Sequence, residues 1–307
     1  MDVKIRESGD AALRLERARG FSGEFLGRLV VLFKLRVVVL LLLAALGGAL
    51  LASHGSLTPG QIFILFLTGT LSSAGASAIN QYIERDRDGR MTRTCQRPLA
   101  VGMFARPETA LEVSVVLVIL AVMIALPYSM PLACFLAAGA AIYIWVYTLW
   151  LKARTWLNII IGGAAGSCAV LSGGAAAGNW MEPAVLALAL LVFFWTPIHF
   201  WSLALAYRGD YARAGVPMLP VVVSARASAI WITFHTALVA LIALLMGLHP
   251  SLGWYYLIFA APATLWLGWH SLRLIQTPDH KQALKLFTVS NMYLGFVLVA
   301  IYLVTLF

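Results

Sequence analysis

Long apolar stretches separated by short polar segments run through almost the whole chain. Nine of these stretches reach the roughly 20 residues that an α-helix needs to cross a bilayer. They lie at about 33–53, 61–82, 108–127, 131–151, 158–178, 184–206, 224–247, 252–273 and 284–306. The pattern predicts an all-α polytopic membrane protein with nine transmembrane helices. We expect residues 1–27 to form a cytoplasmic tail and residues 28–307 to form one transmembrane domain.

Composition excludes a water-soluble globule. Hydrophobic residues make up 61% of the 307 residues, charged residues 11%, and the mean hydropathy is +0.87. A soluble domain carries roughly 25% charged residues. The three cysteines show no CxxC or Cys/His spacing, so the sequence predicts neither a disulfide framework nor a cysteine metal site.

The basic residues predict the orientation. All 22 Lys and Arg residues lie in the N-terminal segment or in alternate loops, and the other loops and the C-terminus hold none. The positive-inside rule therefore predicts a cytoplasmic N-terminus and a C-terminus outside. We expect a multi-pass protein of the cell inner (plasma) membrane with its basic loops in the cytoplasm. Because topology explains the net charge of +9, that charge does not indicate a nucleic-acid partner.

An acidic cluster follows the second predicted span. Asn80, Glu84 and Asp88 have i, i+4, i+8 spacing, which places them on one face of a helix. Two carboxylates four residues apart repel each other, and a divalent cation between them reverses that cost. Mg²⁺ is typically held by one or two carboxylates with waters and phosphate oxygens. Gly89 indicates a helix end, and fraying there would bring Asp86 into the same site.

Arginines interleave with and follow these acids: Arg85, Arg87, Arg90, Arg93 and Arg97. Guanidinium groups bind phosphate oxygens in a bidentate manner. Carboxylates for Mg²⁺ beside arginines for phosphate predict a diphosphate site. The alternative is an ordinary cytoplasmic loop, but acids contribute little to topology and three of them fall within five residues.

Two other cytoplasmic loops carry candidate residues. Asp210, between Arg208 and Arg213, is a candidate second acidic group, or forms a surface salt bridge worth at most about 1 kcal/mol. Tyr147 ends the fourth span, and Lys152 and Arg154 follow it. These two cations reach a diphosphate from a third side, or they only set topology and extend to the membrane surface.

His199 lies about two turns inside the sixth span. Polar residues at such a depth usually face a cavity or the bundle interior. A lone histidine is more often a hydrogen-bonded core residue than a ligand. The surrounding aromatic residues, including Trp195 and Trp201, either pack the bundle or wall a site for a flat ring or an allylic cation.

The run from Asn80 to Leu99, NQYIERDRDGRMTRTCQRPL, resembles the first acidic motif of UbiA-type intramembrane prenyltransferases. Within that superfamily the chain is most similar to the protoheme IX farnesyltransferase (heme O synthase) branch. Several shorter segments carry that similarity, which covers roughly residues 28–300: Lys34-Leu35-Arg36, Tyr147 to Lys152, His199-Phe200-Trp201, Asp210 to Pro220, and Lys285-Leu286-Phe287 with Ser290.

The chain departs from the family pattern at three positions. Glu84 stands where the family usually has Asp, and Ile198 where a second proline is common. Ala214 stands where the wider superfamily has an acid four residues after Asp210. This last departure matches the heme branch and weakens an interpretation as a 4-hydroxybenzoate or chlorophyll prenyltransferase.

The resemblance implies transfer of farnesyl from farnesyl diphosphate to a vinyl group of heme b, giving heme O and diphosphate. It implies Mg²⁺ as the cofactor, with metal ligands among Asn80, Glu84, Asp86, Asp88 and Asp210. Four of these, Asn80, Glu84, Asp88 and Asp210, are the expected catalytic residues. The expected substrate-binding residues are Lys34, Arg36, Arg93, Arg97, Tyr147, Lys152, Arg208 and Tyr211, with His199 and Trp201 on the heme side. Further candidate partners are heme A synthase and assembly factors of a terminal oxidase.

Three alternatives remain at this stage. One is a UbiA-type enzyme that uses another acceptor. Another is a b-type cytochrome or heme carrier, with axial ligands from His199, His235 and His270, but it leaves the acidic cluster unexplained. The third is an ion-coupled transporter, which predicts acids deep in the membrane where the sequence has none.

Overall fold

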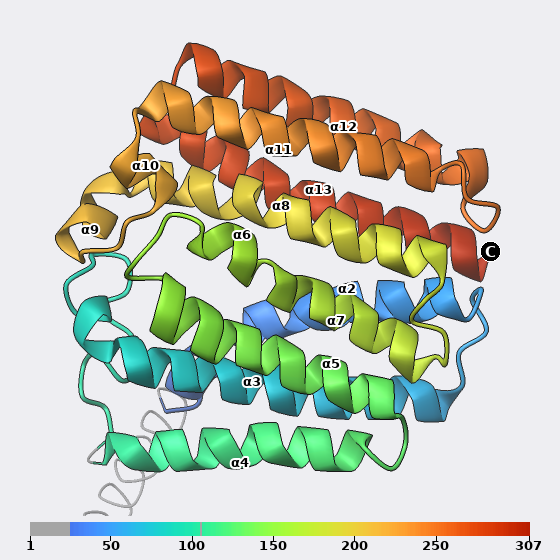
Figure 1. Ribbon diagram of the computed structural model, residues 1–307, viewed down its shortest axis with the longest axis horizontal. Coiled ribbons are helices and arrows are strands. Elements are labelled where there is room, and N and C mark those ends of the chain that lie inside the picture. Colours follow the sequence, from blue (N-terminus) through green and yellow to red (C-terminus); the bar gives the residue numbers. More distant parts are fainter. Residues whose placement is uncertain (1–24, 105) are drawn as a thin grey trace, which may run out of the picture.

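The computed structural model describes residues 25–104 and 106–307, and within them the regular structure is helical throughout. The long helices lie roughly side by side (Figure 1): α2 (Leu35–Ala52), α3 (Pro59–Asp88), α4 (Pro107–Ala125), α5 and η1 (Met130–Ala141 and Ile142–Leu151), α6 and α7 (Asn158–Gly162 and Ala164–Ala176), α8 (Pro183–Ala206), α11 (Ala225–Met246), α12 (Gly253–Gln276) and α13 (His280–Leu306). Two short helices, α9 (Arg208–Arg213) and α10 (Leu219–Val222), connect α8 to α11.

Eight spans in the described part of the chain are long and apolar enough to cross a membrane, with α5 and η1 forming one of them and α6 and α7 another. The chain is therefore a multi-pass membrane protein. These eight match eight of the nine predicted spans, and only α12 does not reach the required apolarity. α3 is longer than predicted because its helix continues through the polar residues after position 82.

Local sequence explains where several helices begin. Thr58 and Gln61 form a capping box at the start of α3, with Pro59 in the first helical position. Asp279 caps α13 by accepting a hydrogen bond from the backbone N–H of Gln282 at 2.7 Å. These caps satisfy backbone groups that would otherwise have no partner at a helix end.

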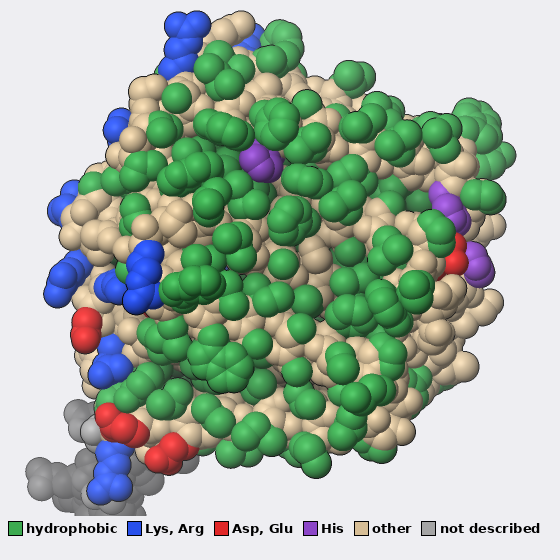
Figure 2. Space-filling view, viewed as in Figure 1, with side chains coloured by type: hydrophobic (Ala, Val, Ile, Leu, Met, Phe, Trp, Pro, Cys, Tyr) green, Lys and Arg blue, Asp and Glu red, His purple; other side chains and the backbone are tan. Residues whose placement is uncertain are grey.

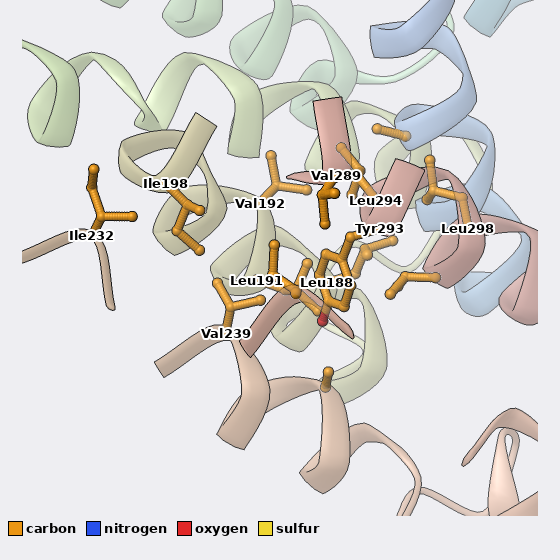
Figure 3. Close-up of a cluster of buried hydrophobic side chains, with 14 of the residues drawn as sticks. Leu188, Leu191, Val192, Ile198, Ile232, Val239, Val289, Tyr293, Leu294 and Leu298 are labelled. Atoms are coloured by element: carbon orange, nitrogen blue, oxygen red, sulfur yellow. The ribbon is translucent and has the colours of Figure 1, made fainter. Parts of the chain in front are cut away.

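The main core lies where α8, α11 and α13 meet (Figure 3). Leu188 and Leu191 of α8, Val239 of α11 and Tyr293 of α13 are fully buried there. The outer surface is also apolar: hydrophobic side chains cover the face shown in Figure 2. This distribution is expected of a bundle that is surrounded by lipid tails.

The two ends of the bundle differ in charge. On the face shown in Figure 2, Lys and Arg side chains gather along one edge, and the opposite edge shows none. The basic edge is the end that holds α9 and α10, whereas the C-terminus lies at the other end (Figure 1). The helices therefore bring the basic loops to one end of the molecule, as the sequence predicted.

Glycine permits the closest helix contact, between α2 and α7. A Cβ atom at Gly173 would lie 1.7 Å from the carbonyl oxygen of Ala45, and one at Gly48 would lie 2.2 Å from that of Val170. The two backbones touch at both positions, and neither backbone can move aside as a flexible side chain can. Small residues at such contacts are a common device of membrane bundles.

We predict that Gly173→Ala destabilises the bundle by more than about 1–3 kcal/mol, the usual cost of overpacking, because the added methyl group meets backbone. Thermal unfolding of the protein in detergent, followed by size-exclusion chromatography, measures this change. Gly268→Ala is the matched control, since a Cβ atom there meets nothing within 4 Å. Equal stability of the two variants would contradict the prediction.

Candidate active site

The acidic face of α3 is buried at the basic end of the bundle. The helix runs without interruption through Asp88 and is capped by Gly89, so Asn80, Glu84 and Asp88 share one face. These three residues are 2%, 2% and 4% exposed, respectively. The predicted i, i+4, i+8 alignment is thus present, and it points inward.

Asp86 lies on a different face and is exposed. The sequence interpretation required fraying near Gly89 to bring this residue into the site. Because the helix stays regular through Asp88, the structure does not bring Asp86 to the acidic face.

Basic side chains from other segments pair with the buried carboxylates. The ammonium group of Lys152 lies 2.5 Å from one oxygen of Glu84 and donates to the other at 2.6 Å. The guanidinium group of Arg97 donates to both oxygens of Asp88, at 2.9 and 2.7 Å. These pairs connect α3 to the segment after η1 and to the loop between α3 and α4.

Lys34 approaches the same face from the start of α2. Its backbone adopts the left-handed conformation, with φ 49° and ψ 45°, which costs a non-glycine residue about 1–2 kcal/mol. The side chain donates to Asn80 Oδ1 at 2.7 Å and to the hydroxyl of Tyr143 at 2.9 Å. Burial, and secondarily the positive charge of Arg97, lowers the pKa of Lys34 to about 7.

The π-helical turn of η1 lines up several of these partners. A π-helix bonds residue i to residue i+5 and often marks a functional site. Tyr143, Thr148 and Lys152 lie about one such turn apart, and the backbone N–H of Lys152 donates to Tyr147 at 2.9 Å. Thr148 accepts from Asn80 at 3.0 Å. Sequence analysis missed Tyr143 because an α-helical register turns a residue five positions before Thr148 away from Thr148 and Lys152; it did not weigh Thr148, which lies four residues before Lys152.

Asp210 connects the loop after α3 to α9. Asp210 is 6% exposed, accepts a hydrogen bond from the Thr92 hydroxyl, and pairs with Arg213. Tyr211 beside it is also buried. Asp210 is therefore buried, whereas the sequence analysis gave a salt bridge on the surface as one of its two interpretations. Its contact with Thr92 is a link that sequence analysis did not identify.

Three predicted substrate-binding cations, Arg36, Arg93 and Arg208, are exposed. Arg36 makes no contact with the buried cluster in the described part of the chain. Arg208 donates to the backbone carbonyl of Val223 at 3.4 Å. The positive charge of Arg93 is close enough to interact electrostatically with the side chain of Tyr147, and Tyr211 interacts with the same side chain. Of the three, only Arg93 lies near the cluster.

His199 lies between α8 and α13. Its ring stacks on Trp195 and Phe287, with centroids 4.7 and 4.3 Å away, and its Nδ1 lies 3.1 Å from the Ser290 hydroxyl. That hydroxyl also lies 2.8 Å from the carbonyl oxygen of Phe287. When the hydroxyl donates to this carbonyl, Nδ1 of His199 donates to the hydroxyl and Nε2 keeps its lone pair.

Trp201, two residues after His199 and on the opposite face of α8, is fully buried beside Trp156 and His235. Its indole N–H has no hydrogen-bond partner within residues 25–104 and 106–307. An unpaired buried donor is costly and usually has an explanation, such as a ligand or a water molecule.

The donor set at the acidic face fits Mg²⁺. No three His, Cys, Asp or Glu side chains of the described residues gather closely enough to enclose a metal. Mg²⁺ does not need such a cage, since one or two carboxylates with waters and substrate phosphates suffice. Glu84 and Asp88 supply two hard oxygen donors on one face, and Asn80 a neutral third.

Relatives of known name cover most of the chain. It is 46% identical over 275 residues to a protein of Saccharolobus islandicus (strain L.S.2.15 / Lassen #1) named protoheme IX farnesyltransferase, a match that covers 89% of this chain and 95% of the relative. A protein of the same name from Metallosphaera sedula is 40% identical over 276 residues, covering 90% and 95%.

Solved structures share the fold. One comes from work on the biosynthesis of digeranylgeranylglyceryl phosphate synthase in membranes; it has a TM-score of 0.77, 20% identity, and coverage of 92% of this chain and 99% of the other. A UbiA homolog from Archaeoglobus fulgidus bound to GPP and Mg²⁺ has a TM-score of 0.64 at 14% identity, with coverage of 89% and 99%. The model of the UbiA prenyltransferase family matches residues 41–297. The chain therefore belongs to the UbiA prenyltransferase family and, within it, to the protoheme IX farnesyltransferases.

Proposed function

We propose that this chain transfers the farnesyl group of farnesyl diphosphate to a vinyl group of heme b; water then adds as a hydroxyl group with loss of a proton, which gives heme O, and diphosphate is released. The names of its relatives support this reaction, and residues 28–307 form the single domain that performs it. The observation that carries the proposal is the buried cluster itself: carboxylates of α3 surrounded by cations from three other segments.

Mg²⁺ is the proposed cofactor. The residues that would hold it are Glu84 and Asp88, with Asn80 beside them and Asp210 across the site. A UbiA homolog has been solved with GPP and Mg²⁺ bound, which supports a divalent cation in this fold. When bound, the ion supplies Lewis-acid stabilisation of the charge that develops on the departing diphosphate.

The cations of the cluster supply fixed positive charge for the same step. Arg97 and Lys152 flank the acidic face and are partly buried, so their charges act in a medium that screens them weakly. Lys34, whose pKa is lowered to about 7 by burial, is only partly protonated near neutral pH. Breakage of the C–O bond leaves negative charge on diphosphate and positive charge on the allyl group. The apolar interior below the cluster then shields the allyl cation from water until the vinyl group attacks.

His199 is the proposed contact for the heme acceptor. It lies seven residues before the end of α8, which corresponds to about 10 Å of helix. A farnesyl chain whose diphosphate is held at the acids extends into this layer. With the proton on Nδ1, the lone pair on Nε2 suits a heme iron. Trp201, with its unpaired indole N–H, lies on the opposite face of α8.

The proposed orientation has the acidic site at the cytoplasmic face of the inner membrane. We include α12 as the ninth span because its 24 residues extend about 36 Å, which is enough to cross the bilayer. An odd number of spans then places a cytoplasmic N-terminus and an external C-terminus on opposite sides.

Asp88→Asn should lower turnover at least about 10²-fold while the protein still accumulates in the membrane, because one carboxylate for the metal is lost. Release of diphosphate from farnesyl diphosphate, with heme b and Mg²⁺, measures this. Asp86→Asn is the matched control, two residues away but exposed, and should retain nearly full activity. If Asp88→Asn were as active as Asp86→Asn, the acidic cluster would be only a charged surface and not a metal site.

The same assay separates the proposed reaction from its rivals. The wild-type enzyme should release diphosphate only when heme b is present, and the product should carry the mass of a hydroxyethylfarnesyl heme. Tight heme binding without diphosphate release would instead indicate a cytochrome or heme carrier. Turnover with a quinone precursor but not with heme would assign another acceptor.

His199→Ala should raise the Michaelis constant for heme b far more than that for farnesyl diphosphate and should change the absorbance of bound heme. Ser290→Ala is the comparison, because it removes the hydrogen bond and keeps the imidazole ring. If both variants lose only thermal stability, with kinetic constants and spectrum unchanged, His199 is a packing residue. The hydrogen bond between His199 and Ser290 would then contribute about 1 kcal/mol to the stability of the bundle.

A reporter fused after Phe307 should be active only outside the cytoplasm. The reason is that basic residues lie on one side of an odd number of spans. An alkaline phosphatase fusion, inactive in the cytoplasm, and a green fluorescent protein fusion, fluorescent only there, give opposite readouts. Fluorescence of the second fusion would show that the number of spans is even.

A further inference from the structure

Lys34 lies at a turn between two helical segments. Residues 25–32 are helical, Phe33 and Lys34 form the turn, and α2 begins at Leu35. The left-handed backbone of Lys34 sets the direction in which its side chain leaves the chain. Because this conformation costs a non-glycine residue about 1–2 kcal/mol, contacts around the turn have to offset it.

The side chain of Gln81, on α3, caps the helical segment that ends at this turn. Its amide nitrogen donates to the backbone carbonyl of Val31 at 2.7 Å and to that of Leu32 at 2.9 Å. Carbonyl groups at the end of a helix lack partners within the helix, and a side-chain donor can satisfy them. Since carbonyl oxygens only accept, the nitrogen of the amide group, and not its oxygen, has to face them.

These two hydrogen bonds explain why a glutamine occupies this buried position. Gln81 is 1% exposed, and its amide oxygen has no hydrogen-bond partner within residues 25–104 and 106–307. A buried acceptor without a partner costs about 1–3 kcal/mol. An apolar side chain would avoid that cost, and the surroundings would suit it, because Leu32 packs there with Ala78 and Leu99. The glutamine therefore serves the two carbonyl groups before the turn.

Consecutive residues of α3 hold the two sides of the turn. Gln81 binds the backbone before the turn, whereas Asn80 accepts a hydrogen bond from the ammonium group of Lys34 at 2.7 Å. The same ammonium group donates to the hydroxyl of Tyr143 at 2.9 Å. The position of Lys34 Nζ is thus determined by Gln81 through the backbone and by two neutral oxygens at the acidic face.

Lys34 differs from the other two basic side chains of the cluster in the partners that it leaves when it moves. Arg97 is paired with Asp88. Lys152 is paired with Glu84 in the same way, so each of these two cations uncovers a buried carboxylate when it leaves. Lys34 bonds only neutral oxygens, and it can therefore turn to an incoming diphosphate without uncovering a negative charge.

We propose that Gln81 is a positioning residue for the donor substrate: it holds the left-handed turn that directs the ammonium group of Lys34 to the diphosphate of farnesyl diphosphate. This inference rests on the proposed function, which places the diphosphate at the acidic face. A displacement of about 1 Å in a positioning group can cost on the order of 10²-fold. The alternative is that Gln81 only anchors residues 25–32 to α3, in which case its loss lowers stability and nothing else.

The first measurement is the dissociation constant of farnesyl diphosphate, with Mg²⁺ and without heme, by isothermal titration calorimetry of the full chain in detergent. Gln81→Met keeps the length of the side chain and removes both donated hydrogen bonds. It should raise this constant about tenfold, and the Michaelis constant for farnesyl diphosphate should rise with it. The Michaelis constant for heme b should stay within about twofold, because the acceptor layer at His199 is about 10 Å deeper.

Gln61→Met is the matched control. It makes the same substitution at the other end of α3, where the glutamine belongs to the capping box of the helix. Loss of this cap should lower the melting temperature but leave the dissociation constant of farnesyl diphosphate unchanged. Gln81→Asn keeps the amide group on a shorter side chain and should lie between the wild type and Gln81→Met. This milder variant carries the test if Gln81→Met does not fold.

A double-mutant cycle with Lys34→Met separates positioning from anchoring. Lys34→Met alone should raise the dissociation constant at least about tenfold. In that background, Gln81→Met should change the constant by less than about twofold, because the group that it positions is gone. The decrease in melting temperature that Gln81→Met causes should persist in both backgrounds, since the capped carbonyl groups are still present.

Several outcomes would overturn the inference while the proposed function stands. If Gln81→Met resembles Gln61→Met, with a lower melting temperature and an unchanged dissociation constant, Gln81 only anchors the helical segment. If the effects of Gln81→Met and Lys34→Met multiply, Gln81 acts through another group. If Lys34→Met has no effect, Lys34 does not bind the diphosphate. A wild-type protein that binds farnesyl diphosphate but releases no diphosphate with heme b would instead overturn the proposed function, and the dissociation constants would still test the role of Gln81.

Discussion

Burial of charge in a bundle that excludes water constrains the whole basic end of this protein. An isolated carboxylate in a medium of low dielectric constant is unstable unless it is paired and hydrogen-bonded. Each buried acid here meets that condition: Glu84 pairs with Lys152 and Asp88 with Arg97, cations from other segments, and Asp210 pairs with Arg213 of the same helix, α9. The first two pairs therefore hold η1, α3 and the loop after α3 together, and the charges of each pair neutralise each other.

The same pairs prepare the site for a charged substrate. In the proposed reaction, Glu84 and Asp88 would hold a divalent cation, and Lys152 and Arg97 would then be available to the diphosphate. Lys34 contributes differently, since it bonds neutral oxygens of Asn80 and Tyr143, and the strained backbone at this residue is consistent with a functional position.

The sequence predicted the helices well because apolar length alone determines a membrane span, and it predicted the α3 face because i, i+4, i+8 spacing is local. It could not predict which cation meets which acid: the Arg97–Asp88 pair depends on how the loop after α3 folds. Hydropathy also does not register the π-helical turn that aligns Tyr143 and Thr148 with Lys152. The sequence also does not show whether a helix frays at its glycine, and the regular end of α3 keeps Asp86 on a different face from Glu84 and Asp88. Apolarity alone does not identify α12 as a span. This helix packs against α11 and α13, and such packing does not require a uniformly apolar surface.

The division of labour between Lys152 and Arg154 follows from chain geometry. Residues that lie two apart on a turn leaving a helix face different directions, so one short segment presents one cation inward and another outward. The inward cation is bound by Glu84, and only the outward one remains without a carboxylate in the described residues. Lys152 therefore serves the acidic face of α3, whereas Arg154 presents its charge at the surface of the basic end of the bundle.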